Sequence, residues 1–243
     1  DRIRVTYFEP ETTHGDEKEV SAEFRLKGIV PITKPATPFN RRGARKFDGL
    51  IELPRPERSG LFAEIYAVKH DYPMLSFYGS GPDTEKGGRT RYKLQDTAID
   101  GRFGVRPFRH FSVGGSAGYV TTETGLGFNE NYTRVAAFAQ YDTRDIPGGA
   151  RRGGNYFVQL SDYRDFKRLD IEGQRFIPFL NERRVIALRA KTSMILRDAW
   201  NTIPFYMQPM LGGGDDLRGY RPYRFRGDNL MVMTAEYRWE VFS

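Results

Sequence analysis

Apolar and polar residues alternate with a period of two along much of this chain. The longest alternating stretches read EVSAEFRLKG, RRVIALRAKTSMIL and NLMVMTAEYRWEVF, and shorter ones occur at 2–8, 110–120 and 132–142 and from Asn155 onward. Successive side chains of a β-strand point to opposite faces, so this period predicts strands with one apolar and one polar face. Stretches with the period of a helix are scarce. We therefore expect an all-β fold.

Turn-forming clusters separate these stretches: NRRGAR, GSGPDTEKGG, VRPFRH, TRDIPGGARRGG and LNER. Some connections are short, such as RPFRH and FLNER, whereas others are long, namely 31–46, 79–91, 143–154 and 197–228. Long strands joined by short turns and long loops are typical of outer-membrane barrels, whose periplasmic turns are short and whose external loops are long. The pattern predicts a transmembrane antiparallel β-barrel with about twelve strands.

Polar and apolar residues also alternate in the strands of a soluble β-sandwich, so alternation alone does not identify a membrane barrel. The residue types on the two faces help to separate these two folds. One face carries charges of both signs, on Arg189, Lys191, Glu236, Arg238 and Glu240. The opposite face is unbroken aliphatic and aromatic. It places Tyr237 and Trp239 near a strand end, as an interfacial aromatic belt would. This arrangement favours the membrane barrel over a soluble binding sandwich.

Composition narrows the functional classes. The 243 residues include no cysteine and only three widely spaced histidines, which excludes disulfides and Cys-based metal sites and argues against a His-rich metal centre. The net charge of +7 is spread along the chain rather than gathered on one face, so we expect no nucleic-acid partner. The first residues lack the basic and apolar parts of a signal peptide, so we expect a chain that is either processed or cytoplasmic.

Candidate catalytic residues have simpler explanations. GGSAG at 114–118 matches a hydrolase nucleophile motif, but Ser116 lies in an alternating stretch with no helix after it. We expect its small residues to permit close packing or curvature instead. The acid pairs Asp142 with Asp145 and Asp162 with Asp165 adjoin arginines, which favours loop salt bridges over acid–base chemistry. The sequence predicts no enzyme and no cofactor.

The segment LGGGDDLRGYRPYRFRGDNL is unusually rich in both arginine and aromatic residues for a loop. Arg218 lies between Leu217 and Gly219-Tyr220, and the strand that follows carries Glu236 on its polar face. A guanidinium buried in a wet lumen needs a carboxylate partner to offset its desolvation, and Glu236 is the candidate. We expect Gly219 to permit a backbone conformation or a close approach that a side chain would block.

Three separated motifs resemble the bacterial outer-membrane assembly and translocation superfamily, the surface antigen family of BamA-like and TamA-like barrels. LRGY at 217–220 with AEYRW at 235–239 is similar to its signature loop and the following strand. FYGSGPDTEKGGRTRYKL at 77–94 and YDTRDIPGGARRGGNYFVQL at 141–160 are similar to two further family segments. Together they extend over 77–242, in the family's order.

The resemblance implies a barrel whose long sixth external loop folds back into the lumen. Arg218 would be the lumenal attachment of the motif Leu217, Arg218, Gly219 and Tyr220, and Glu236 its partner on the wall. The family's F-x-D-x-G strand, which supplies a second acid, is not found before Ser243, and POTRA repeats are not found either. We therefore predict a single barrel domain over 1–243 without POTRA repeats. It would be either a complete barrel of about twelve strands or part of a sixteen-stranded one.

The function that the resemblance implies is insertion or transport of proteins, or of lipids, at the bacterial outer membrane. Partners would be outer-membrane lipid and lipopolysaccharide, substrate outer-membrane proteins and accessory periplasmic subunits. The alternative is a passive channel or structural barrel that keeps the family's loop but has no insertase activity.

Overall fold

The computed structural model describes residues 4–8, 20–27, 45–52, 60–81, 83–146, 149–180, 183–197, 203–212, 216–220 and 223–239, the first three ranges as backbone only. The strands are β1 (Arg4–Phe8), β2 (Val20–Lys27), β3 (Arg45–Glu52), β4 (Gly60–Phe77), β5 (Thr90–Phe108), β6 (Phe111–Thr124), β7 (Asn129–Asp142), β8 (Gly153–Asp162), β9 (Lys167–Phe179), β10 (Arg184–Leu196), β11 (Met210–Leu211), β12 (Phe225–Arg226) and β13 (Asn229–Trp239). A single 3-10 turn, Lys86–Gly88, is the one helical element within these ranges. The expected all-β class is confirmed. None of the described residues forms a helix that is long and apolar enough to cross a membrane.

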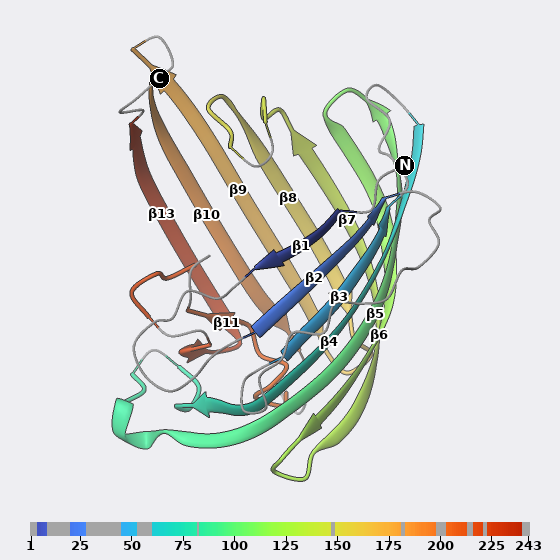
Figure 1. Cartoon of the computed structure of the whole chain (residues 1–243), viewed down its shortest axis with the longest axis vertical. Helices are drawn as coiled ribbons and strands as arrows, with labels where there is room; N and C mark the ends of the chain where they lie inside the picture. The colour runs from blue at the N-terminus through green and yellow to red at the C-terminus, as the bar shows by residue number, and fades with distance from the viewer. Residues whose placement is uncertain are drawn as a thin grey trace.

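One strongly curved sheet contains all the long strands (Figure 1). Its order is β1-β2-β3-β4-β5-β6-β7-β8-β9-β10-β13, and the nine strands from β3 to β13 are antiparallel neighbours. β2 pairs in parallel with β3, which departs from the expected all-antiparallel order. A parallel pair needs a connection of about a dozen residues or more, which the chain has between these strands. Pairing of β1 with β13 is not among the described ladders, so closure into a barrel is not shown.

The connections fall at two ends of the sheet. The loop end holds the connections from β4 to β5 and from β10 to β13, and the turn end holds Arg109–His110 and the short turn between β9 and β10. The connection from β7 to β8, over 143–152, also lies at the turn end, so grouping it with the external loops was wrong. Antiparallel order alone fixes the end at which a connection lies, whatever its length. The expected long loop at 31–46 falls mostly outside the described residues.

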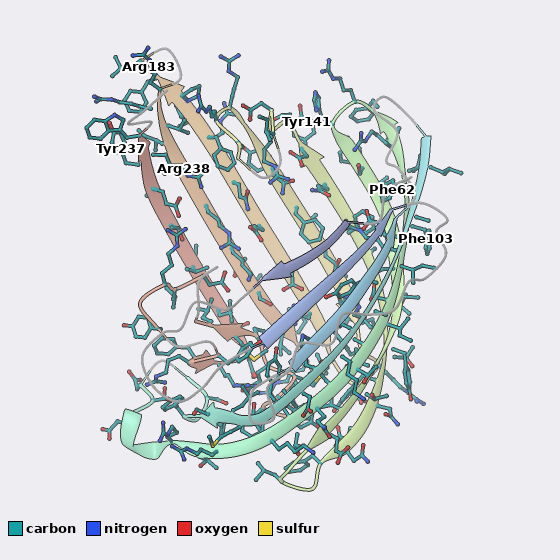
Figure 2. The ribbon with its side chains drawn as sticks, viewed as in Figure 1. Phe62, Phe103, Tyr141, Arg183, Tyr237 and Arg238 are labelled. Carbon is teal, nitrogen blue, oxygen red and sulfur yellow. The ribbon has the colours of Figure 1, made fainter. Side chains whose placement is uncertain are left out.

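The two faces of the sheet differ as the alternation predicts. On β13, Val232 faces the concave side and is 7% exposed, whereas its neighbour Met233 faces outward and is 70% exposed. Figure 2 shows Phe103 and Tyr237 on the outside of the curved sheet. The outward face, called here the outer face, exposes large apolar side chains on most strands. They include Leu61, Ile65, Ile99, Phe103, Val135, Tyr141, Val158, Ile171, Ile186, Leu188, Met231, Met233, Tyr237 and Trp239.

The concave side, called here the inner wall, carries the charged residues. Arg189 and Lys191 lie there on β10, and Glu236 lies there on β13 beside Arg238. Glu240, expected on the same face, is outside the described residues. Further along the wall, the Arg134 guanidinium contacts the Asp100 carboxylate. The expected separation of a charged face from an apolar face is confirmed on these strands.

An aromatic core fills the inner side of the sheet at the loop end. It draws on the wall strands and on the connections from β8 to β9 and from β10 to β13, with members Tyr72, Leu75, Tyr92, Leu94, Tyr132, Tyr163, Phe166, Ile195, Ile203 and Tyr206. Burial of large aromatic side chains is a major source of stability. The loop is therefore part of the folded core rather than a solvated connection.

The small residues of GGSAG serve close packing between β5 and β6. A Cβ at Gly114 would overlap the backbone carbonyl of Phe103, and one at Gly118 would overlap the Asp100 carboxylate. Ser116 lies in β6, is 3% exposed and accepts a hydrogen bond from Arg134 at 3.3 Å. The expectation that these small residues permit close packing is confirmed.

Candidate functional site

Residues 197–228, called here the long loop, connect β10 to β13. Its short hairpin pairs β11 with β12, through Met210 opposite Arg226 and Leu211 opposite Phe225. This hairpin lies on the concave side near the loop end (Figure 1). The N–H of Gly81, in the connection from β4 to β5, donates to the carbonyl of Arg226 at 2.7 Å. The long loop thus bridges strands that are far apart in the sheet.

The LRGY motif forms a tight turn that faces β13. The N–H of Tyr220 donates to the carbonyl of Leu217 at 3.0 Å and closes the turn. From it, the Arg218 Nη2 donates to Glu236 Oε1 at 2.8 Å. The other carboxylate oxygen, Oε2, accepts from Nε and Nη2 of Arg238 at 3.1 and 3.0 Å. Glu236 therefore binds two guanidiniums.

Exposure sets the strength of this contact. The Arg218 side chain is 76% exposed and that of Glu236 is 25% exposed. The expectation of a desolvated Arg218 was wrong, although the structure does bring these two residues together. Ion pairs this open to solvent stabilise proteins by about 0–1 kcal/mol. The lumenal role that the resemblance gives to Arg218 stays a prediction.

The other motif residues are only lightly packed. A Cβ added to Gly219 would meet no heavy atom within 4 Å, and Gly219 does not have a positive φ. The expected need for glycine at this position was therefore wrong. Tyr220 is half-exposed and contacts the Phe225 ring edge-on, with 5.0 Å between ring centroids. Leu217 is half-buried.

Asp216, just before the motif, attaches the long loop to the inner wall at a position that is more buried than the contact between Arg218 and Glu236. Its side chain is 12% exposed and accepts from Arg189 Nη1 at 3.1 Å and from Lys191 Nζ at 3.2 Å. Arg189 also donates through Nε to Glu172 at 2.8 Å. Asp216 was missed from the sequence. The sequence does contain a pattern that indicates such a residue. Arg189 and Lys191 share the polar face of one strand, and two neighbouring cations on a partly buried wall need a carboxylate partner.

Two further arginines of the long loop are buried. Arg226 is 3% exposed and donates from Nη1 to the carbonyl of Phe205 at 2.9 Å and from Nη2 to the Tyr92 hydroxyl at 2.6 Å. Burial lowers the pKa of Arg226, because desolvation disfavours the charged guanidinium. Among the described residues, every hydrogen-bond partner of this side chain is a neutral oxygen.

Arg224 attaches the loop to the connection between β4 and β5. It is 9% exposed and donates to the side-chain oxygen of Thr84 at 2.7 Å and to the Thr84 carbonyl. Its guanidinium lies 4.2 Å from the centroid of the Tyr78 ring, a cation–π distance. Sequence reasoning treated Arg224 and Arg226 only as members of an arginine-rich segment.

The acid pairs singled out in the sequence lie at the ends of β7 and β8 and in the connections that follow, and Asp142, Asp145 and Asp162 contact arginines or backbone N–H groups. Asp142 pairs with Arg144 at 2.7 Å. Desolvation opposes ionisation of Asp145, but hydrogen bonds from the N–H groups of Ile146, Arg152 and Arg151 outweigh it and lower the pKa of this carboxyl. Such contacts join Asp145 to Arg151 and Arg152 across the connection.

Asp162 accepts from the N–H of Arg164 at 2.8 Å. Within the described ranges, no group of three or more His, Asp or Glu side chains is arranged to hold a metal ion.

Neither protein-family models nor curated proteins give a match to this chain. The superfamily named above therefore stays a prediction that rests on the sequence motifs. The geometry shows a long loop held against the inner wall of a curved sheet by charged and aromatic contacts.

Proposed function

We propose that this chain forms a transmembrane β-barrel of the bacterial outer membrane and acts there in the insertion or transport of proteins or lipids. The apolar outer face of the sheet supports the membrane location. The resemblance to the assembly and translocation superfamily supports the function.

The observation that carries the proposal is the exposure of the outer face. Water-soluble monomers rarely expose contiguous apolar patches larger than a few hundred Å². Here Phe103, Leu61 and Met233 are 61%, 81% and 70% exposed, while charged side chains line the concave side. At the turn end, Tyr237 and Trp239 are 54% and 61% exposed, which suits an aromatic belt at a membrane surface.

The long loop supports the same proposal. A loop that folds into the lumen and contacts the wall through Arg218 and Glu236 is what the resemblance implies, and the 2.8 Å contact agrees with it. In the mechanism that the resemblance implies, substrate strands enter at a weakly closed seam beside thinned membrane. The loop would meanwhile hold the barrel interior in one shape. No covalent step is required.

Assisted folding tests the proposal directly. The protein, reconstituted in liposomes, should speed the insertion of a urea-unfolded outer-membrane barrel above the rate in empty liposomes. A Glu236→Ala variant that is still incorporated into liposomes is the matched comparison. We expect it to speed insertion of the unfolded barrel less than the natural protein does. Equal rates in loaded and empty liposomes would contradict an insertase role.

A passive channel is the second candidate, and the inner wall offers an observation in its favour. A cavity of about 310 Å³ on the wall is lined by Glu64, Asp100, Arg102 and Arg134 among others, as the side of an aqueous pore would be. Steady ion conductance in planar bilayers would favour this candidate if deletion of the protein left the amounts of other outer-membrane proteins unchanged. A fall in those amounts would favour the insertase.

A further inference from the structure

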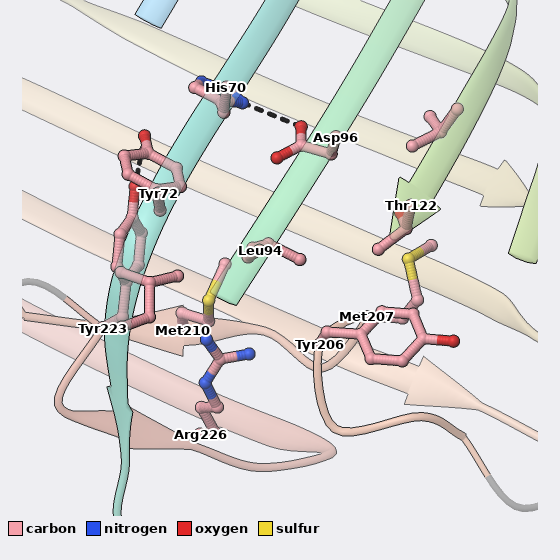
Figure 3. Close-up of a pocket in the computed structure, with 12 residues that line it drawn as sticks. His70, Tyr72, Leu94, Asp96, Thr122, Tyr206, Met207, Met210, Tyr223 and Arg226 are labelled. Carbon is pink, nitrogen blue, oxygen red and sulfur yellow. Dashed lines mark hydrogen bonds and ion pairs between the residues drawn. The ribbon is translucent and has the colours of Figure 1, made fainter. Parts of the chain in front are cut away.

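A second cavity, called here the loop cavity, lies between the long loop and the inner wall (Figure 3). Its volume is about 160 Å³, and its walls come from β4, β5 and β6 on one side and from the long loop on the other. Most of the lining is apolar and includes Leu94, Val120, Met207 and Met210. An engineered apolar cavity of roughly 150 Å³ accommodates benzene, so this volume fits a small organic molecule.

Arg226 brings a buried charge to the edge of this cavity. Its Nε has no hydrogen-bond acceptor among the described residues, although Nη1 and Nη2 are both bonded. In Figure 3 the guanidinium points toward the cavity beside Met210 and Leu94. This nitrogen is enclosed by the protein, so a ligand in the cavity would reach the guanidinium through its Nη groups. A buried cation that bonds only to neutral oxygens favours a ligand with an anionic acceptor.

Two pairs of polar groups in the cavity lining are hydrogen-bonded to each other. Asp96 is the one carboxylate among the described residues that line it, and its Oδ2 is hydrogen-bonded to His70 Nδ1 at 2.8 Å. The hydroxyls of Tyr72 and Tyr223 lie 3.3 Å apart. No ion pair joins Asp96 to Arg226 in the described part of the chain, so the charge of Arg226 is not matched there.

We propose that the loop cavity binds a small monocarboxylate with an apolar body. The carboxylate would accept from the Arg226 guanidinium, whose Nη1 and Nη2 each carry a second N–H besides the ones that bond to Phe205 and Tyr92. The body would pack against Leu94, Met207 and Met210. A carboxylate supplies the charge and the acceptor that the guanidinium requires. A compact aromatic or short aliphatic body matches the volume and the apolar lining.

Such a ligand would also hold the long loop in place. The cavity exists only while the loop lies on the wall, because each contributes part of the lining. A ligand that binds only the docked state of the loop stabilises that state, and the stabilisation grows with the logarithm of the ratio of ligand concentration to Kd. This inference does not depend on the insertase proposal, since it concerns the docked loop in any barrel.

Benzoate is a suitable probe, and benzyl alcohol is a neutral control of similar size. With the protein purified in detergent, isothermal titration should show benzoate binding at least about tenfold more tightly than benzyl alcohol. Benzoate should also slow amide exchange in residues 203–212 and 223–228. Equal affinity for the two probes, or no benzoate binding at millimolar concentration, would overturn the proposal.

Two variants and one control locate the site. Arg226→Met removes the cation and should abolish the preference for benzoate. Val120→Phe fills the cavity from β6 and leaves the loop sequence intact, so it keeps the test valid if Arg226→Met does not fold. Arg91→Met, an exposed position on β5 outside the cavity, should bind benzoate as the natural protein does. Unchanged benzoate binding in Val120→Phe would contradict the proposed site.

Discussion

The long loop is attached to the sheet at three places. Asp216 pairs with Arg189 and Lys191 on β10, and the other two attachments differ most in kind. On β13 the attachment is the exposed pair of Arg218 and Glu236. On the side of β4 and β5 it is Arg224 and Arg226, which are 9% and 3% exposed. The motif that carries the resemblance thus lies at the more solvated attachment. Arg224 and Arg226, which lie outside that motif, form the buried one.

Solvent explains why the two attachments should differ in strength. Water screens a pair as open as Arg218 with Glu236, and holding two long side chains together costs conformational entropy. A buried guanidinium that bonds to Phe205 and Tyr92 leaves both oxygens without a donor when it is removed. We therefore expect most of the loop's docking energy to come from the buried attachment.

The largest effect should follow from Arg226→Ala. The change opens a void in the core and deprives the Phe205 carbonyl and the Tyr92 hydroxyl of their donor, at a cost of about 2–4 kcal/mol in loop docking. Hydrogen exchange of residues 203–212 should then become much faster, while exchange in β8 and β9 stays slow. Unchanged protection of the loop would show that the buried attachment is not the stronger one.

Asp216→Asn should have an intermediate effect. It removes the charge that faces Arg189 and Lys191, and because Asp216 is 12% exposed the expected loss is about 1–3 kcal/mol. Denaturant unfolding in detergent measures it. Lys167→Gln, which removes a weak exposed pair with Asp162 at 3.7 Å, is the control and should change stability by less than about 0.5 kcal/mol.

Arg218→Ala should cost no more than about 1 kcal/mol, in line with the exposure of its side chain. Glu236→Ala should cost more, because Arg238 loses its carboxylate as well. Both should lower folding yield, which the heat-dependent shift in gel mobility of the folded form reports. Normal gel behaviour and normal function in both variants would refute any role for this pair.

The smallest effect should come from Gly219→Ala, at which we expect a change of less than about 0.5 kcal/mol. A Cβ there meets nothing within 4 Å. Gly153→Ala is the contrasting variant, because Gly153 has φ +91° and a Cβ would overlap the Thr143 carbonyl. If Gly219→Ala destabilised the protein as much as Gly153→Ala, the motif would need its glycine after all.

The strands predicted from the sequence are ones in which polar and apolar positions alternate clearly. On β10 and β13 the inner positions carry charged residues among apolar ones such as Val185 and Val232, and the outer positions are mostly apolar. β3, β4, β5 and β9 were not identified as alternating stretches. On β4 the inner face also carries apolar residues such as Phe62, Val68 and Tyr72. A register shift between Tyr72 and Leu75 further interrupts its alternation. Period-two patterns fade where both faces of a strand are apolar.

The candidate site was predictable only where partners lie close in sequence. Arg218 and Glu236 are separated by 18 positions, and the alternation of β13 pointed to Glu236. Arg224 and Arg226 find their partners Thr84 and Tyr92 across 140 and 134 positions. No local pattern encodes such contacts, since they depend on how the whole sheet curves.

We expect the outer face of the sheet to lie in lipid, and spin labels on β13 test this most directly. The chain has no cysteine, so single-cysteine variants for spin labelling need no background changes. With the protein in liposomes, a label at Met233→Cys on the outer face should collide often with dissolved oxygen and seldom with a water-soluble nickel chelate. A label at Thr234→Cys, on the inner wall of the same strand, should be less accessible to oxygen. If the Met233 label met the nickel chelate as freely as a label at the exposed loop residue Glu85, the outer face would lie in water and the membrane account would fail.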